Sequence, residues 1–243
     1  MKTVIVTGAS RGIGRTTAIL FALKGFNVLI NYNQSEAEAF KTYDRLKKMG
    51  ITVDTFKADI AKRKQVDSMV EHCIKLFGGV DILINNAGIC QQKLFLDISE
   101  QEWDMMMDIN LKGVFNCTQS VLKYMLMQKK GKIINISSIW GMVGASCEVH
   151  YSTAKAGVIG MTKALAKELA PSNIQVNCIA PGIVKTDMLS SFIDKELNEL
   201  KNETQLMKIG RSKDIAFCAL YLASKGADFV TGQVISPNGG FVI

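Results

Sequence analysis

Residues that bind metals are scarce in this sequence. It has two histidines, His72 and His150, and none of its six cysteines belongs to a Cys-x-x-Cys pair. Because zinc sites need clustered cysteine and histidine ligands, we expect no metal site. Cysteines scattered among mostly apolar neighbours are typical of proteins whose thiols stay reduced, so we expect a cytoplasmic location.

Long apolar runs, internal repeats and linkers are also missing. No run approaches the roughly 20 apolar residues that span a membrane, and residues 2–7 read as a strand rather than as a signal peptide. Hydrophobic residues make up 48% of the 243 residues, enough to bury a sizeable core. We therefore expect one domain over residues 1–243 and no contact with a membrane.

The net charge is +7, with basic clusters at residues 62–64 and 129–132. Neither cluster is long or interleaved with aromatic residues, which argues against a nucleic-acid partner. A positive surface does attract phosphate-bearing cofactors and acidic partners. The charge therefore favours a phosphate-bearing cofactor or an acidic partner without identifying either.

Apolar stretches alternate with helical patterns along the chain. The predicted strands cover residues 2–7, 26–31, 51–57, 80–84, 132–136, 174–179 and 232–235. Strands that are apolar throughout are typical of a parallel sheet covered by helices on both faces. We predict an α/β fold, a doubly wound Rossmann-type domain with a seven-stranded parallel sheet.

Two of the intervening helices are predicted to begin with capping boxes, at Ser35–Glu38 and at Ser99–Glu102. The second helical run continues through Asn110 to about Met127. A polar residue inside a helical run is locally unfavourable. Asn110 therefore either faces solvent or holds a water molecule near a functional site.

A glycine-rich loop, Gly8-x-x-x-Gly12-x-Gly14, joins the first strand to the first helix. Glycines in this position let a pyrophosphate approach the backbone and the helix N-terminus, although the spacing differs from G-x-G-x-x-G. The second strand ends at Asn31 without the carboxylate that binds the ribose of NAD. Arg11 in the glycine loop suits a 2′-phosphate, which favours NADP unless this arginine is merely exposed to solvent.

Polar side chains after two further strands extend the predicted cofactor site. Asp59 follows the third strand and either contacts adenine or caps the next helix. Asn85-Asn86-Ala87-Gly88 follows the fourth strand and reads as a second loop of the same crevice.

A proton-transfer site is predicted after the fifth strand. Ser138 ends this strand, and Tyr151 and Lys155 lie one helical turn apart on one face of the next helix. A phenol has a reference pKa of about 10. A neighbouring ammonium lowers the pKa of a phenol and makes Tyr a usable acid or base. An exposed Tyr–Lys pair is the alternative.

Together these motifs resemble the short-chain dehydrogenase/reductase family over the whole chain. The matching residues are Thr7, Gly8, Gly12, Ile13, Gly14, Asn85, Asn86, Ala87, Gly88, Asn110, Ser138, Tyr151, Lys155, Pro181 and Gly182. The resemblance implies that Tyr151 is the general acid or base, that Lys155 lowers its pKa and that Ser138 holds the substrate oxygen. It also implies that Asn110 retains a water molecule, and that the enzyme is a homotetramer or a dimer, of which we expect the homotetramer.

The same resemblance implies a set of NADP(H) contacts. These are Gly8, Ser10, Arg11, Gly12, Ile13, Gly14, Asn31, Asp59, Ile60, Asn86, Ala87, Gly88, Tyr151, Lys155, Pro181, Gly182, Ile183 and Thr186. Within the family, Arg11, the turn at 31–33 and the closing Asn238-Gly239-Gly240 resemble bacterial 3-oxoacyl-[acyl-carrier-protein] reductases. This implies NADPH-dependent reduction of a 3-oxoacyl thioester, carried on acyl carrier protein or on CoA, in fatty acid biosynthesis.

Residues 139–150 depart from that pattern and are similar to reductases of the 5-aminopentanone group attached to elongation factor P. Glu148 could pair with the amine of such a substrate. The alternatives are that Glu148 faces solvent or caps the Tyr151 helix. Substrate contacts are expected at Ser138, Trp140, Glu148 and Met188, the last within an amphipathic insertion at about 185–210 that forms either a lid over the cleft or a plain surface helix.

Three functions follow from these observations. The first is NADPH-dependent reduction of a 3-oxoacyl thioester, and the second is reduction of the ketone on elongation factor P. The third is an NADP-binding sensor without turnover, a class that tends to lose the Tyr or the Lys that this chain retains.

Overall fold

The computed structural model describes residues 1–186 and 199–243. Its main sheet has seven parallel strands in the order β3-β2-β1-β4-β5-β6-β9. These are β1 (Thr3–Val6), β2 (Asn27–Tyr32), β3 (Val53–Lys57), β4 (Ile82–Asn85), β5 (Gly131–Ile136), β6 (Ile174–Ile179) and β9 (Val234–Ile235). The chain winds outward from β1 in both directions, which confirms the predicted doubly wound parallel sheet.

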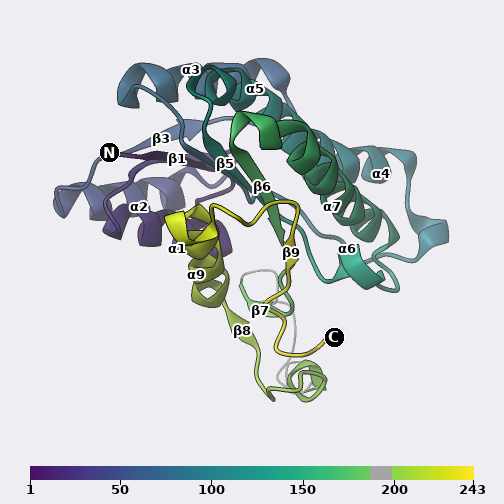
Figure 1. Cartoon of the computed structure of the whole chain (residues 1–243). Coiled ribbons are helices and arrows are strands. Elements are labelled where there is room, and N and C mark those ends of the chain that lie inside the picture. Colours follow the sequence, from purple (N-terminus) through teal and green to yellow (C-terminus); the bar gives the residue numbers. More distant parts are fainter. Residues whose placement is uncertain (187–198) are drawn as a thin grey trace.

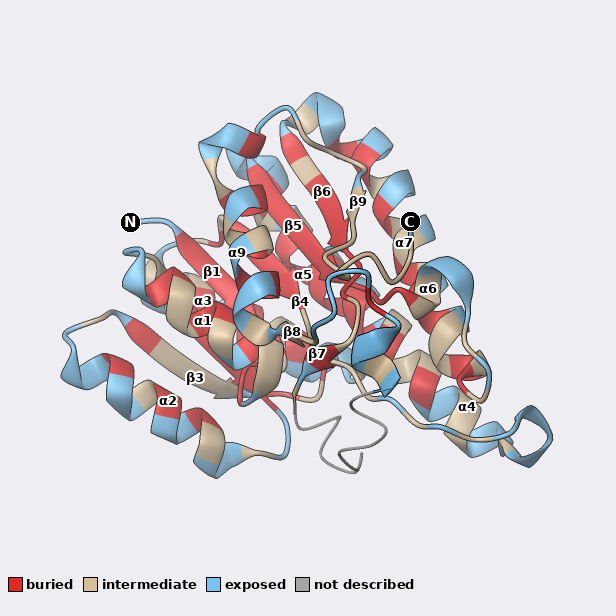
Figure 2. Cartoon of the chain, turned by 90° about the horizontal axis from the view of Figure 1, so that it is seen from below, coloured by how far each residue is buried: buried red, intermediate tan, exposed pale blue. Residues whose placement is uncertain are grey.

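Helices cover both faces of this sheet (Figure 1). One face carries α1 (Gly12–Leu23), α2 (Glu36–Lys48) and α9 (Ser212–Ala223), and the other α3 (Arg63–Phe77), α5 (Gly113–Gln128) and α7 (Val149–Leu169). Val4 and Val6 enter the core beneath the first group, whereas Ile5 between them enters the core beneath the second. Both faces are therefore buried, and the central strands are buried along their length (Figure 2).

The two predicted capping boxes have different outcomes. At α4 (Glu100–Met107), the Ser99 N–H donates to Glu102 at 2.8 Å and the Glu102 N–H donates to Ser99 Oγ at 3.2 Å, so this box is confirmed. At α2 the box is wrong, because Ser35 makes no side-chain cap. The Glu38 carboxylate accepts from the Lys41 ammonium at 2.6 Å instead, the stronger, charge-assisted partner.

The helical run through Asn110 is interrupted. A π-helical turn, Asp108–Lys112, separates α4 from α5. Within it the Asn110 side-chain amide donates to the carbonyls of Met106 at 3.1 Å and Ile89 at 3.0 Å. Asn110 is fully buried, so the solvent-facing interpretation is wrong. Turns of this type are frequent at functional sites.

Two short strands bracket the predicted lid. β7 (Val184–Lys185) pairs in parallel with β8 (Gly210–Arg211). Met188 lies outside the described residues, so its substrate contact and the lid stay predictions. The predicted loop 139–150 contains a one-turn helix, α6 (Trp140–Val143). Within residues 1–186 and 199–243, no helix is both long and apolar enough to span a membrane.

Candidate functional site

A cavity of about 720 Å³ opens at the carboxyl ends of the central strands. Nearly all of the predicted site residues line it, from Gly8 after β1 to Thr186 after β7. They are Gly8, Ser10, Arg11, Gly12, Ile13, Asn31, Asp59, Ile60, Asn86, Ala87, Gly88, Asn110, Ser138, Trp140, Glu148, Tyr151, Lys155, Pro181, Gly182, Ile183 and Thr186. Among the described residues only Gly14 of the predicted set lies outside the lining.

The glycine loop packs against the loop that follows β4. Gly8 has a φ of +61°, and a Cβ there would come within 2.7 Å of Ala87 Cα. A Cβ on Gly14 would collide with the Asn86 amide and would lie 2.5 Å from the Gly8 carbonyl oxygen. Gly14 therefore acts beneath the cavity wall, where it allows the start of α1 to approach. The first N–H groups of a helix have no partner within the helix, so the start of α1, which borders the cavity at Gly12 and Ile13, suits a pyrophosphate.

Two asparagine side chains, the buried Asn31 and the half-buried Asn86, hold this arrangement. Asn31 Oδ1 accepts from the Gly8 N–H at 3.2 Å, and its amide nitrogen donates to the Ala58 carbonyl at 3.0 Å. The Asn86 amide donates to the carbonyls of Thr7 at 2.9 Å and Gly8 at 3.1 Å. Both side chains border the cavity, but their amides bind backbone groups of the protein.

The far end of the cavity carries no carboxylate after β2. Tyr32, Asn33, Gln34 and Ser35 line it there, together with Arg11. Asp59 Oδ1 accepts from the Ala61 N–H at 3.0 Å, within a turn that precedes the first helical residue of α3. The helix-capping interpretation of Asp59 is therefore wrong, and its carboxylate stays at the cavity.

The predicted proton-transfer residues converge at the opposite end. Ser138 follows β5, and its Oγ accepts from the Trp140 N–H at 3.2 Å. Tyr151 and Lys155 lie one turn apart on α7, with the ammonium 5.7 Å from the centre of the phenol ring. The ammonium also donates to the Ile136 carbonyl at 3.0 Å. The exposed-pair interpretation fails because Lys155 is only 4% exposed.

Burial controls the ionisation of this pair. It raises the pKa of Tyr151 above the ordinary value for a phenol, with further increases from Cys90 and Glu148, while a hydrogen bond with Ser138 opposes them. Burial also lowers the pKa of Lys155 to about 8. That Lys155 lowers the pKa of Tyr151 stays a prediction, since in the protein alone burial of the phenol sets the direction of the shift.

Asn110 and Lys155 meet across Gly88. A Cβ at Gly88 would lie 2.6 Å from Asn110 Oδ1 and 3.3 Å from Lys155 Nζ. Asn110 Oδ1 accepts from the Ile89 N–H at 3.2 Å. Glycine is therefore required at position 88 so that Asn110 and Lys155 can lie next to each other in the wall of the cavity. The water molecule predicted at Asn110 remains a prediction.

Glu148 is neither exposed nor a side-chain cap. The residue is 6% exposed, and although it precedes α7 its carboxylate makes no capping bond. Its oxygens accept from the Gln92 amide at 3.2 Å and from the Cys90 thiol at 3.5 Å. Both alternatives to a substrate contact are therefore wrong. In the described part of the chain, the donors to this buried carboxylate are neutral.

Sequence reasoning missed the role of the segment after Gly88. Ile89, Cys90, Gln91 and Gln92 line the cavity, as do Val184 and Leu200. Their only signal was position, since segments after parallel strands gather at one edge of the sheet. On the other wall, Trp140 packs edge-to-face on Phe241, with ring centres 5.5 Å apart. Residues 1–186 and 199–243 contain no group of three or more His, Cys, Asp and Glu side chains placed to hold a metal ion.

Comparisons with known proteins agree with this geometry. The sequence matches the short chain dehydrogenase family over residues 2–197. It is 43% identical over 239 residues to the 3-oxoacyl-[acyl-carrier-protein] reductase FabG of Staphylococcus epidermidis, covering 98% of each chain. The proteins of the same name from Staphylococcus aureus and Thermotoga maritima are 42% and 39% identical, covering 98% and 100% of this chain and 97% and 98% of theirs. The resemblance to the short-chain dehydrogenase/reductase family is confirmed, and the chain belongs to that family.

Proposed function

We propose that this protein is an NADPH-dependent carbonyl reductase that acts on a 3-oxoacyl thioester. One observation carries the proposal: Ser138, Tyr151 and Lys155 converge at one end of a cavity whose other end is bordered by the glycine loop. The names of the similar bacterial reductases support a 3-oxoacyl substrate held on acyl carrier protein. CoA is the alternative carrier.

The cavity wall fits a dinucleotide. Gly8 and Gly12 both have positive φ and leave the start of α1 open. The atom nearest to the position that a Cβ on Gly12 would take is Thr186 Cγ2, at 3.6 Å. We assign the pyrophosphate to these residues, adenine to Asp59 and Ile60, and the nicotinamide end to Ile183 and Thr186. NADPH supplies the hydride, and every other step belongs to the protein.

Tyr151 delivers the proton in the proposed reaction. Ser138 holds the carbonyl oxygen beside the phenol, so that negative charge develops between two O–H donors. The raised pKa of Tyr151 keeps the phenol protonated until that charge forms. Lys155 then stabilises the phenolate, and Asn110 holds the water molecule that connects the lysine to solvent.

Arg11 is assigned to the 2′-phosphate of NADPH. The segment from Tyr32 to Ser35 offers polar groups but no carboxylate to repel that phosphate. The Arg11→Ala variant should raise KM for NADPH by about tenfold or more and leave KM for NADH unchanged, because only NADPH carries the group that the guanidinium binds. An equal effect on both cofactors would contradict this assignment.

Several broader features belong to the same proposal. We infer one NADP-binding domain over residues 1–243, with the segment at about 185–210 as a lid over the substrate end. The resemblance to the family supports a homotetramer in the cytoplasm. The exposed Lys129, at the end of α5, is a suitable contact for an acidic carrier protein.

The test is NADPH oxidation with acetoacetyl-CoA and with a carrier-bound 3-oxoacyl chain. The Tyr151→Phe variant should lose at least about a thousandfold in kcat, since it keeps the ring but removes the proton. Tyr43→Phe, on α2 and outside the cavity, is the matched control and should behave as the wild type. Robust turnover by Tyr151→Phe would refute the catalytic assignment, and the absence of turnover by the wild type across a ketone panel would favour the sensor.

Glu148 favours a second candidate, the reductase of the 5-aminopentanone group on elongation factor P. A buried carboxylate with only the neutral donors Gln92 and Cys90 in the described structure is incompletely compensated. A substrate ammonium would supply the missing charge, whereas an acyl chain gains nothing from a carboxylate. The chemistry at Tyr151 is the same for both candidates.

A pair of ketones separates the two candidates. The Glu148→Gln variant should lower kcat/KM for an amino ketone by about tenfold or more without lowering it for a neutral ketone of matched length. Equal effects on both ketones would remove the basis for the second candidate. In a deletion strain, mass spectrometry should also find elongation factor P with its modification two hydrogens lighter, and an unchanged mass would refute this function.

A further inference from the structure

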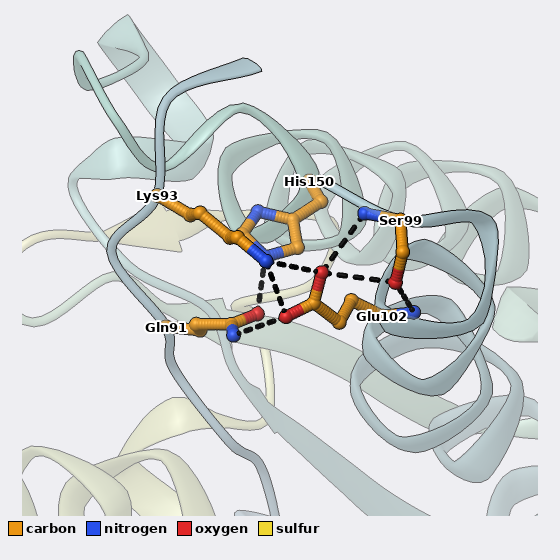
Figure 3. A network of polar contacts seen from close by, with 5 residues as sticks. All are labelled: Gln91, Lys93, Ser99, Glu102 and His150. Atoms are coloured by element: carbon orange, nitrogen blue, oxygen red, sulfur yellow. Dashed lines mark hydrogen bonds and ion pairs between the residues drawn. The ribbon is translucent and has the colours of Figure 1, made fainter. Parts of the chain in front are cut away.

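Four side chains form a hydrogen-bond chain between the protein surface and the residue before Tyr151 (Figure 3). Lys93 Nζ donates to Glu102 at 2.8 Å, and the same carboxylate accepts from the Gln91 amide at 2.8 Å. Gln91 Oε1 lies 3.2 Å from His150 Nε2. His150 has no exposed surface, whereas Lys93 and Glu102 lie nearer to solvent. These four hydrogen-bonded side chains therefore reach from solvent to the start of α7.

The direction of every bond in this chain is fixed. A carboxylate only accepts, so the Gln91 amide nitrogen must face Glu102, and its carbonyl oxygen must face His150. A carbonyl oxygen also only accepts, so His150 Nε2 must carry the hydrogen. Among the described residues His150 Nδ1 has no hydrogen-bond partner. A hydrogen on Nδ1 would be a buried donor without an acceptor, which agrees with the Nε2–H tautomer.

The same contacts tie two cavity walls together. Residues 89–93, here called the 89–93 loop, supply four consecutive lining residues. Besides the His150 bond, this loop is joined to the segment before α7 by the Lys93 N–H to the Cys147 carbonyl at 2.7 Å and by Gln92 to Glu148. Among these contacts, the one between His150 and Gln91 joins the 89–93 loop to the helix that carries Tyr151.

We propose that His150 is a positioning residue, which sets the 89–93 loop against the substrate through its Nε2–H bond to Gln91. The proposal rests on the proposed reductase activity for its kinetic test. His150 does not reach the reacting atoms in this role; it acts through Gln91 on the wall that faces the substrate. Specificity is then determined partly by a residue next to the proton donor.

The kinetic test uses substitutions that keep or remove the donor. His150→Leu should raise KM for the carbonyl substrate about tenfold, the effect of one lost buried hydrogen bond, with KM for NADPH unchanged. His150→Gln, whose amide reaches a similar position with an N–H donor, should restore KM. Gln91→Leu should reproduce the effect of His150→Leu, and the double variant should add nothing further. Additive effects, or no rescue by glutamine, would overturn the proposal.

A second measurement needs no activity. The chain has only two histidines, so the imidazole nitrogens of His150 can be assigned in ¹⁵N NMR spectra by comparison with His72→Gln. His72 pairs with Asp54 at 2.8 Å between α3 and β3, outside the cavity, so His72→Gln is also the kinetic control. The expected spectrum has His150 as the Nε2–H tautomer, and this preference should be lost in Gln91→Leu. An Nδ1–H tautomer in the wild type would overturn the proposal even if the enzyme acts on another ketone.

Discussion

Replacing Lys155 by methionine should make stability depend differently on pH. Burial lowers the pKa of Lys155 from 10.5 to about 8, so the folded state holds the ammonium less well than the unfolded chain does. Below the folded pKa both states are protonated, and the folded state bears the whole penalty. As pH rises from about 8 towards the unfolded pKa, the folded state loses its proton first and the penalty disappears. Lys155 therefore destabilises the fold fully at neutral pH and below, and less as the pH rises above about 8.

The size of the effect follows from the shift. At 1.36 kcal/mol for each pKa unit, the penalty is about 3 kcal/mol at about pH 7 and falls to about 1 kcal/mol at about pH 9.5. Lys155→Met removes this penalty and also removes the hydrogen bond to the Ile136 carbonyl. The folded pKa of Lys155 already includes that bond, so the change between the two pH values follows from the folded and unfolded pKa alone. The stability gained by the variant should therefore shrink by about 2 kcal/mol between them.

The assay is urea unfolding of both proteins at the two pH values, with reductant and at one protein concentration. The variant must be compared with the wild type because buried thiols also make the free energy of unfolding depend on pH. Burial raises the pKa of Cys73 and Cys117 to about 12, so each stabilises the fold below the unfolded thiol pKa and loses that contribution as pH rises. These losses occur in both proteins and cancel in the difference.

The result that would refute this reasoning is a difference in stability that stays the same at both pH values. It would mean that Lys155 keeps its ordinary pKa in the fold, and that its burial does not oppose the charge. The methionine variant should also be inactive at both pH values, because no ammonium remains beside Tyr151. A variant that gains stability and loses activity would show that the site costs the fold free energy.

Two steric predictions test the glycines of the cavity. Gly14→Ala should lower the free energy of unfolding by about 1 kcal/mol and weaken NADPH binding, because overpacking against the Gly8 carbonyl outweighs the gain in helix propensity. Urea unfolding and KM for NADPH measure these effects. A variant as stable as the wild type would contradict the prediction. Gly88→Ala should leave the circular dichroism spectrum unchanged but lower kcat at least about tenfold, because its methyl group would displace Asn110 or Lys155. An unchanged kcat would show that catalysis does not depend on the positions of these two side chains.

The sheet could be predicted from the sequence because each strand carries its own evidence. An apolar run such as residues 4–6 is buried on both faces of the sheet. The π-turn could not be predicted, because its cause is remote. The Asn110 amide is satisfied by the carbonyl of Ile89, in a loop that only the folded chain brings near. The false capping box at Ser35 also depended on a competitor, Lys41.

The candidate site, too, contains residues that local sequence patterns predict and others that depend on contacts between remote segments. Gly8, Ser138 and Tyr151 were identifiable because each follows a strand or starts a helix, and the sheet brings such positions to one edge. The surroundings of Glu148 were not identifiable. Its donors, Cys90 and Gln92, come from a loop with no regular pattern, and their contact with Glu148 exists only after folding.

In the proposed reaction, the burial of Glu148 connects the choice of substrate to proton transfer from Tyr151. Its negative charge contributes to raising the pKa of Tyr151, after burial and Cys90. A substrate ammonium bound to Glu148 would neutralise that charge and ease ionisation of the phenol, whereas an acyl chain would leave the charge in place. A cationic substrate would then make proton donation by Tyr151 easier. With a neutral substrate, the negative charge of Glu148 would remain and would keep opposing ionisation of the phenol. The effect of Glu148→Gln on kcat for each ketone, and not only on KM, therefore shows which substrate this site suits.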